Sequence, residues 1–311
     1  MEFGILGPLE VVQDGRQLTP VRPKQRVVLA LLLLRRNEVV ATDELVDALW
    51  GETPPETAPT ALRGHVSALR KLLGSDTIET RPPGYILRLR PDQLDLTRFE
   101  KLAHEARGEV DPARKAELLR SALALFRGEP LSDFRYDAFA GNEAARISDW
   151  RLAAQEERFE AELALGLHLD VIPELESLVS ANPQRERLRG QLMLALYRAG
   201  RQGEALHVYQ EGRHELSEQL GLDPGPVLQE LERKILRQDA SLASPVYTPV
   251  RSEEGERSEP IERQPLPVRF VRRHPVAAVL LALAVAVAGA GSATIALRGT
   301  GDAGQIGGDA L

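Results

Sequence analysis

The chain has 311 residues, with 39 Lys or Arg, 46 Asp or Glu and a net charge of −7. At roughly 150 residues per domain, this length predicts about two domains. Because the sequence contains no cysteine, it excludes disulfides, thiolate zinc sites, iron–sulfur clusters and thiol nucleophiles. Aromatic residues make up only 5% of the chain, a composition that favours helix over β-sandwich. Taken whole, the acidic charge argues against a protein that coats nucleic acid.

The first twenty residues predict a small β-hairpin. Residues 3–12 and 15–18 are strand-like, and the dipeptide Asp14-Gly15 between them is typical of a tight turn. The start MEFGILGPLE lacks the basic and apolar pattern of a secretory signal. We therefore expect this end of the chain in the cytoplasm.

Three helices and a second hairpin are expected next. The predicted helices span residues 24–36, 42–50 and 60–73. Pro23 suits the first turn of the first helix, and Thr42 suits the N-cap of the second. Residues 77–89 then read as strand, Pro-Pro-Gly turn and strand. This order predicts a winged helix-turn-helix domain over residues 1–93.

The third predicted helix has one apolar face and one basic face. Leu62, Val66, Leu69 and Leu73 recur at helical spacing and are expected to be buried. The opposite face carries the residues that we predict to contact DNA: Thr60, Arg63, Ser67, Arg70 and Lys71. Arginine can donate two hydrogen bonds to guanine, and small hydroxyls can reach phosphates or base edges. A solvated basic surface is the alternative, but the neighbouring helices and hairpin favour a recognition helix.

Charge is separated along the same region. Residues 21–36 hold five basic residues and no acid, whereas residues 37–58 hold six acids and no base. Arg22 and Lys24 are candidate phosphate contacts, and Arg81 at the hairpin turn could reach the minor groove. The pattern predicts one face directed at phosphates and another directed away from them.

Residues 95–240 have a helical pattern throughout, with regular breaks. The breaks are at Gly108, Gly128, Gly166, Asn182-Pro183, Gly200 and residues 221–225. Tyr197, Gly200, Ala205 and Tyr209 have the spacing of a tetratricopeptide helix pair. An ordinary helical hairpin with a glycine turn explains this spacing equally well. Either way, we expect an all-α domain of stacked helices.

The C-terminal part predicts a linker followed by one transmembrane helix. Residues 241–273 are rich in Pro, Ser, Glu and Arg and read as a disordered linker. Residues 275–297 form an uncharged run that is long enough to span a membrane. The arginines before this run predict that its N-terminal side stays in the cytoplasm. Residues 298–311 would form a short extracytoplasmic tail. An alanine-rich tail, or a helix that packs on a partner, is the alternative.

Several stretches resemble one family. Residues 26–34, 45–55, 62–73 and 84–87 are similar to the OmpR-like winged helix of the AfsR and Streptomyces antibiotic regulatory protein family. Residues 125–131, 192–206 and 220–226 look like the bacterial transcriptional activation domain of that family. The fold expected is mainly α, with small β-hairpins at the N-terminus and a TPR-like helical domain.

This resemblance implies an activator that binds promoter DNA through direct repeats and recruits RNA polymerase, typically as a homodimer on DNA. No cofactor or metal is implied. Larger members of the family carry an ATPase domain, but no phosphate-binding loop of that type occurs in this sequence. The family's other appended domains, a phosphopeptide-binding domain and a receiver domain, are not expected in this sequence either.

Two alternatives to DNA binding fit the sequence less well. An enzyme is disfavoured because the six histidines are scattered and no H-E-x-x-H motif is present. A helical-repeat adaptor or scaffold without a DNA-binding role leaves the separated charge unexplained. Residues 1–94 hold 12 basic and 12 acidic residues, whereas residues 95–240 hold 20 and 27. The acidic excess therefore lies in the helical part, which predicts a balanced DNA-binding domain joined to an acidic, partner-facing domain.

Overall fold

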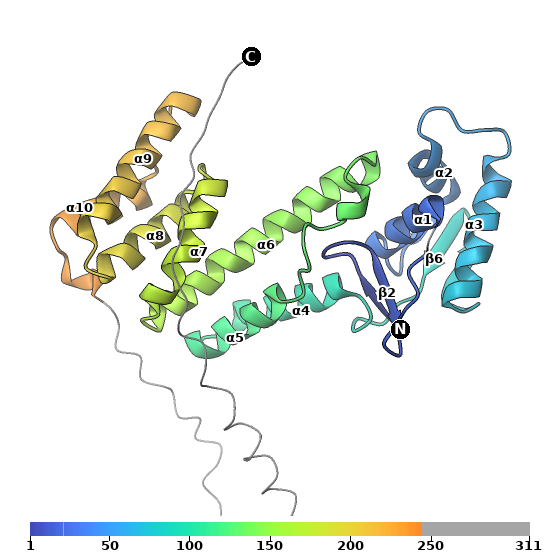
Figure 1. The fold of residues 1–311 in the computed structure, drawn as a ribbon, viewed down its shortest axis with the longest axis horizontal. Helices are drawn as coiled ribbons and strands as arrows, with labels where there is room; N and C mark the ends of the chain where they lie inside the picture. The colour runs from blue at the N-terminus through green and yellow to red at the C-terminus, as the bar shows by residue number, and fades with distance from the viewer. Residues whose placement is uncertain (21, 244–311) are drawn as a thin grey trace, which may run out of the picture. The chain divides into compact units, whose positions relative to one another are not determined.

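The computed structural model describes residues 1–20 and 22–243 (Figure 1). The α-helices are α1 (Pro23–Leu34), α2 (Thr42–Trp50), α3 (Ala58–Leu73), α4 (Asp95–Gly108), α5 (Pro112–Leu123), α6 (Ala138–Ala164), α7 (His168–Ala181), α8 (Glu186–Arg198), α9 (Gln202–Leu220) and α10 (Pro226–Leu236). The strands are β1 (Glu2–Gly4), β2 (Glu10–Gln13), β3 (Arg16–Gln17), β4 (Val39–Ala41), β5 (Ile78–Arg81) and β6 (Gly84–Leu87). Two short 3-10 turns are η1 (Ser132–Phe134) and η2 (Ala240–Leu242).

The N-terminal strands form an antiparallel sheet in the order β1-β2-β3. Asp14 and Gly15 connect β2 to β3 with φ values of 50° and 76°, so the predicted tight turn is confirmed. Positive φ at both positions is typical of the hairpin turns that match the twist of the strands. The sheet has one strand more than the predicted hairpin, because β1 also pairs with β2.

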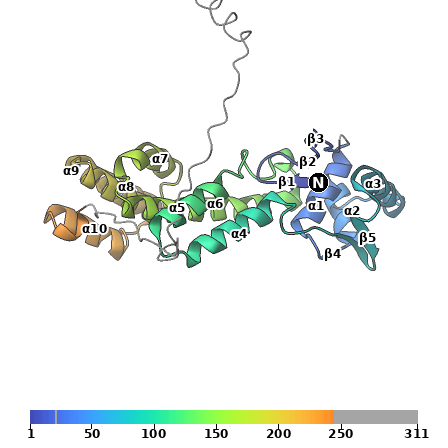
Figure 2. The ribbon, with the colours of Figure 1, turned by 90° about the horizontal axis from the view of Figure 1, so that it is seen from below.

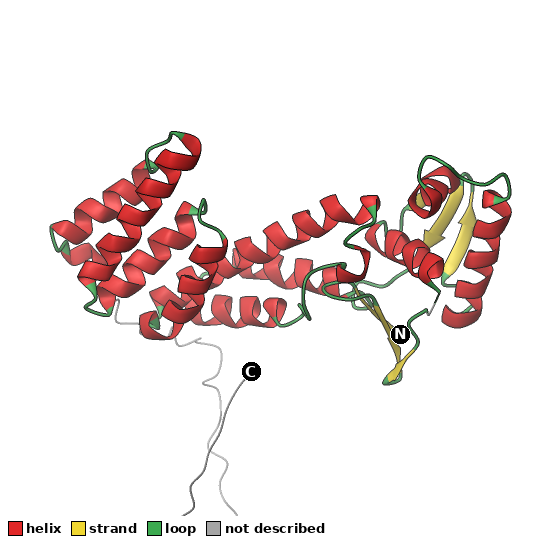
Figure 3. Cartoon of the chain, turned by 45° about the horizontal axis from the view of Figure 1, so that its top comes forward, coloured by secondary structure: helices red, strands yellow, loops and turns green. Residues whose placement is uncertain are grey.

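The winged helix-turn-helix predicted for this region is present. Helix α1 packs against both α2 and α3, and a second antiparallel sheet has the order β4-β6-β5. Figure 3 shows these strands beside the helices. Strand β4 was not predicted, and it pairs with β6 so closely that a Cβ at Gly84 would collide with the Val40 carbonyl. Only glycine fits at this point of the wing.

The predicted N-cap of α2 is wrong. Ala41 is the N-cap residue, and Thr42 is the first residue of the helix. The Thr42 hydroxyl donates a hydrogen bond of 2.9 Å to the Pro83 carbonyl in the turn between β5 and β6. The side chain therefore connects α2 to the wing instead of capping its own helix.

Helix α3 begins at Ala58, two residues before the predicted start, because Pro59 takes a place in the first turn. Its buried face is the predicted one. Leu62, Val66, Leu69 and Leu73 are all buried in the core. The spacing of apolar residues therefore determined the orientation of the helix correctly.

Helices α4 to α10 form the predicted all-α region, in which consecutive helices pack as neighbours (Figure 2). Each predicted break lies at a helix end or in a connection. Gly200, between α8 and α9, has a φ of 77°, a left-handed conformation that favours glycine. Ala205 after this turn is completely buried and Tyr209 nearly so.

The hydrophobic core does not follow the predicted domain division at residues 93–95. One cluster of buried apolar residues runs from Phe3 to Ala154 and includes residues of α1, α3, α4 and α5. A second cluster runs from Leu152 to Leu242 and fills the space between α6 and the last helices. The boundary between the two cores therefore lies within α6.

The connection between the two predicted domains depends on the buried carboxylate of Asp95. This carboxylate accepts hydrogen bonds from the backbone N–H groups of Ile5, at 2.9 Å, and Leu6, at 2.9 Å. It also accepts from the N–H of Leu96 at 2.8 Å and from the Arg127 guanidinium at 3.2 Å. The chain after β1 is thus bound directly to the beginning of α4.

Asp133 in η1 makes a similar connection. Its carboxylate accepts a hydrogen bond of 2.7 Å from the backbone N–H of Leu9 and pairs with Arg26 of α1. A further ion pair joins Arg36 to Glu100 of α4. Arg26 of α1 therefore contacts η1, and Arg36, just after α1, contacts α4.

The predicted linker begins later than residue 241. Residues 240–242 form the packed turn η2, in which Asp239 accepts a hydrogen bond from the Ser241 N–H and Leu242 is buried. The rest of that linker, the predicted transmembrane helix 275–297 and the tail 298–311 lie outside the described residues. Within residues 1–20 and 22–243, none of the helices combines the length and apolar character that crossing a bilayer requires.

Replacing Asp95 by alanine is expected to destabilise the protein by about 2–4 kcal/mol, because it leaves buried N–H groups without an acceptor. Urea unfolding followed by circular dichroism measures the change. Asp92→Ala is the matched control, since Asp92 is exposed and pairs with Arg90 on the surface. Equal unfolding midpoints for the two variants would contradict the role given to Asp95.

Candidate nucleic-acid interface

One face of α3 is open to solvent and carries the predicted DNA-contacting residues. Thr60, Arg63, Ser67 and Lys71 are all exposed. The Arg63 guanidinium donates a hydrogen bond of 3.0 Å to the Thr60 hydroxyl, one turn earlier on the same face. This bond holds the Arg63 side chain along the helix, with its other N–H groups available to an acceptor on DNA.

Arg70, which the sequence also places on this face, is directed to the wing. Its Nε donates to the Ile78 carbonyl at 2.8 Å, and one terminal nitrogen donates to the Thr80 hydroxyl at 2.8 Å. The guanidinium also lies 6.0 Å from the centre of the Tyr85 ring. Arg70 therefore fixes the position of β5 relative to α3, which the sequence did not indicate.

Arg81 lies at the end of β5, beside the turn of the wing, as predicted. Its side chain is 62% exposed and its Nε lies 3.4 Å from Glu79. Arg88 approaches the same carboxylate at 3.4 Å. Hydrogen bonds from Arg88, and then from Arg81, lower the pKa of Glu79, so this carboxylate stays ionised and holds both arginines at the wing.

The beginning of α1 lies beside the middle of α3. The Lys24 ammonium is 4.1 Å from the centre of the Trp50 ring, and Trp50 in turn lies 6.5 Å from the His65 ring. Arg22 immediately precedes α1 and is exposed. The two predicted phosphate-contact residues, Arg22 and Lys24, are thus brought next to the predicted recognition helix.

His65 reports how close these charges are. Burial is the main cause that lowers its pKa from 6.5, and the positive charges of Lys24 and Arg22 lower it further. The lowered pKa favours the neutral form of the imidazole at pH 7 in the DNA-free protein. Among the described residues, no carboxylate lies within ion-pair distance of Lys24 or Arg22, and uncompensated positive charge favours the approach of an anion.

These groups suit a phosphate backbone and exposed base edges. The positively charged side chains of α1, α3 and the wing are directed to solvent. Arginine guanidinium groups make the commonest specific contacts with guanine. The contact between His65 and Trp50 was not predicted from the sequence. Trp50, directly before Gly51 at the end of α2, was the signal in the sequence that could have indicated this contact. In the part of the chain that the structure describes, no group of acidic or histidine side chains could hold a metal ion.

Two protein families match the chain. Residues 16–87 match the family described as "Transcriptional regulatory protein, C terminal". Residues 94–236 match the family described as "Bacterial transcriptional activator domain". The first match covers the wing and α1 to α3, and the second begins one residue before Asp95.

Named relatives contain both regions. The regulatory protein AfsR of Streptomyces griseus is 42% identical over 252 residues, which are 80% of this chain and 26% of AfsR. The regulatory protein DnrI of Streptomyces peucetius is 37% identical over 258 residues, which are 78% of this chain and 94% of DnrI. The chain thus matches almost all of DnrI but about a quarter of AfsR.

A solved structure has the same fold. It shows Mycobacterium tuberculosis EmbR in complex with a low-affinity phosphopeptide, and it is 38% identical with a TM-score of 0.73, over 76% of this chain and 65% of that one. At this identity the similarity extends beyond the fold. With both families matched and DnrI covered almost completely, the chain belongs to the AfsR and Streptomyces antibiotic regulatory protein family of transcriptional regulators.

Proposed function

We propose that the protein activates transcription by binding promoter DNA through its winged helix and by contacting RNA polymerase through its helical region. The observation that carries the proposal is the group of cations on α1, α3 and the wing. In the proposed complex, α3 enters the major groove, Arg63 reads base edges, and Thr60, Ser67 and Lys71 contact the backbone or neighbouring bases. Arg81 contacts the adjacent minor groove.

The roles proposed for the other three cations follow from their positions. Arg22 and Lys24 at the start of α1 would hold a phosphate next to α3, which would fix the register of the protein on the duplex. Arg70 would act mainly by holding the wing, since two of its donors already serve Ile78 and Thr80. Its remaining N–H groups are available to DNA.

For the helical region we propose a partner-facing role. Residues 95–240 hold 20 basic and 27 acidic residues, so this region is repelled by DNA and is suited to a protein surface instead. The proposed partner is RNA polymerase, as the family membership suggests. In this proposal, residues 1–93 bind DNA, and residues 95–240, with a TPR-like arrangement, bind partners. The protein binds two half-sites on DNA as a homodimer.

We also propose that residues 275–297 anchor the protein in the cell membrane with the N-terminus inside. The support is the sequence alone: 23 uncharged residues, preceded by Arg269, Arg272 and Arg273. This arrangement would keep the winged helix on the same side of the membrane as the chromosome. The residues concerned lie outside those that the structure describes.

Replacing Arg63 by alanine is expected to weaken binding to a duplex selected from a random pool by roughly ten- to a hundredfold, the loss typical of a guanine-reading arginine. Lys71→Ala should lower the affinity for the selected duplex and the affinity for an unrelated duplex by similar factors, because a phosphate contact carries no sequence information. Fluorescence anisotropy at several salt concentrations measures both. Lys101→Ala, on the exposed side of α4, is the control.

Arg70→Ala separates reading from positioning. We expect it to lower both DNA affinity and the thermal midpoint, because Arg70 joins α3 to β5. Arg63→Ala should lower affinity alone, since among the described residues Arg63 hydrogen-bonds only to Thr60 on its own helix. Unchanged affinity for DNA in both arginine variants would reject α3 as the recognition helix. An alternative role as an adaptor without DNA binding would then be favoured.

The pKa of His65 is expected to lie below 6.5 in the DNA-free protein and to rise in Lys24→Ala, which removes a nearby positive charge. Because the unfolded state takes up this proton first, the free energy of unfolding should fall as pH falls from about 6.5 through the folded-state midpoint. An NMR titration of the histidine ring protons measures the midpoint. A midpoint at or above 6.5 in the unchanged protein would contradict the cluster.

The full-length chain is expected in the membrane fraction of cells, whereas a chain that ends after Ala243 should stay in the supernatant. Ultracentrifugation followed by immunoblotting of both fractions measures the distribution. Alkaline carbonate washing distinguishes insertion from surface attachment. Equal distribution of the two chains would remove the proposed anchor and leave the DNA-binding proposal unaffected.

A further inference from the structure

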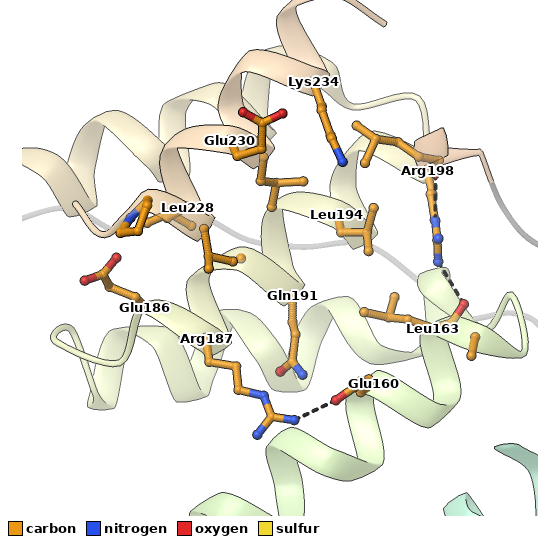
Figure 4. A pocket seen from close by; sticks show the side chains of 16 residues that line it. Glu160, Leu163, Glu186, Arg187, Gln191, Leu194, Arg198, Leu228, Glu230 and Lys234 are labelled. Carbon is orange, nitrogen blue, oxygen red and sulfur yellow. Dashed lines mark hydrogen bonds and ion pairs between the residues drawn. The ribbon is translucent and has the colours of Figure 1, made fainter. Parts of the chain in front are cut away.

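An apolar cavity of about 1060 Å³ lies between α6, α8 and α10 (Figure 4). This volume is at the upper end of the roughly 300–1,000 Å³ that small-molecule sites occupy. Its apolar wall consists of Leu163, Ala164, Leu194, Leu228, Leu231 and Leu242. Val227, at the edge of the cavity, is 84% exposed, which is unusual for a large aliphatic side chain beside so many others.

The acidic residues around the cavity already have partners. Glu160 accepts a bond of 2.6 Å from Arg187, and Glu230 pairs with Arg233 at 2.8 Å. Glu186 accepts a hydrogen bond of 2.7 Å from the backbone N–H of Gly225. Glu160 and Glu230 are therefore paired with arginines, whereas Glu186 is hydrogen-bonded to a neutral N–H group.

Two cations at one end of the cavity are not compensated in this way. Arg198 donates to the Leu242 carbonyl at 3.0 Å and to the Leu163 carbonyl at 2.8 Å, and both acceptors are uncharged. Lys234 lies nearby on α10, and its side chain extends toward the space beside Leu194 in Figure 4. Among the described residues, no carboxylate lies within ion-pair distance of either Arg198 or Lys234. Asp239 interacts with Lys234 only at longer range: hydrogen bonds from Ser241 are the main cause that lowers the pKa of Asp239, and the charge of Lys234 adds to it.

The cavity also contains a polar group with unused capacity. Gln191 of α8 is 9% exposed, and its Nε2 donates to the Glu156 carbonyl at 2.7 Å. Its Oε1 accepts no hydrogen bond from the described residues. A buried acceptor without a donor is costly in a folded protein.

We propose that this cavity binds an amphiphilic carboxylate, with its apolar body against the leucines and its carboxylate beside Lys234 and Arg198. The commitment to an anion follows from the two cations at one end, which have no carboxylate within ion-pair distance among the described residues, whereas Glu160 and Glu230 are paired with arginines. A neutral apolar molecule would leave these cations unused, and an amine would be repelled by them.

This inference is independent of the proposed DNA-binding function. The cavity is built from residues 160–242, and none of the cations of α1, α3 or the wing contributes to it. Ligand binding can therefore be measured without DNA. Failure of one proposal leaves the other standing.

Isothermal titration calorimetry of the full chain with dodecanoate and with dodecylamine, below their micelle concentrations, tests the proposal. The two probes have the same apolar chain and opposite charge. We expect saturable binding of one dodecanoate per chain and at least tenfold weaker binding of dodecylamine.

Two variants locate the site. Lys234→Gln should weaken dodecanoate binding roughly tenfold, because one charged hydrogen bond is lost. Gly190→Leu should abolish binding, since a Cβ at Gly190 would lie 3.5 Å from Leu228 and 3.7 Å from Leu231, and a longer side chain would fill the cavity. Lys101→Gln, an exposed lysine on α4, is the matched control and should bind as the unchanged protein does.

Equal affinity for the two probes, or unchanged dodecanoate binding in Lys234→Gln and Gly190→Leu, would overturn the proposal. The proposal would also be overturned if dodecanoate showed no saturable binding and sedimentation detected a dimer that Gly190→Leu dissociates. A second copy of the chain would then fill the cavity. Thermal unfolding of each variant confirms that the protein is folded before its binding is compared.

Discussion

The carboxylate of Asp95 connects the N-terminal strands with the helical half of the chain. It accepts hydrogen bonds from three backbone N–H groups and from Arg127 in a buried position. Those N–H groups follow β1 and begin α4, so they have no partners within a sheet or helix. Because a buried N–H without an acceptor costs about 1–3 kcal/mol, the path of the chain on both sides depends on this residue. A cluster of apolar residues then continues across the same junction.

The face proposed to bind DNA depends on a second set of internal contacts. Arg70 joins α3 to β5, Thr42 joins α2 to the turn of the wing, and Lys24 covers the ring of Trp50 between α1 and α3. Each contact fixes one element relative to another without using the outward side chains of α3. The geometry of the surface is thus determined by polar side chains that lie at its edge, and its outward residues are available to a ligand.

The spacing of apolar residues and the positions of glycines predicted the helices of the fold well. Leucine spacing identified the buried face of α3, and glycines marked the ends of the later helices. Strand β4 was missed, since three residues are too few for a pattern and the pairing is with a strand more than forty residues away. The residues of the candidate interface were placed on their elements correctly, but the direction of Arg70 depends on Thr80 and on a backbone carbonyl, which spacing along one helix cannot reveal.

The contacts of Asp133 have a consequence for the order in which the protein can form during synthesis. The Leu9 N–H and the Arg26 side chain both find their acceptor in a residue more than a hundred positions later in the chain. A ribosome must therefore release the chain beyond η1 before the first β-sheet and α1 can make their final contacts. Until then, the Leu9 N–H and the Arg26 side chain lack the acceptor that Asp133 supplies in the folded protein.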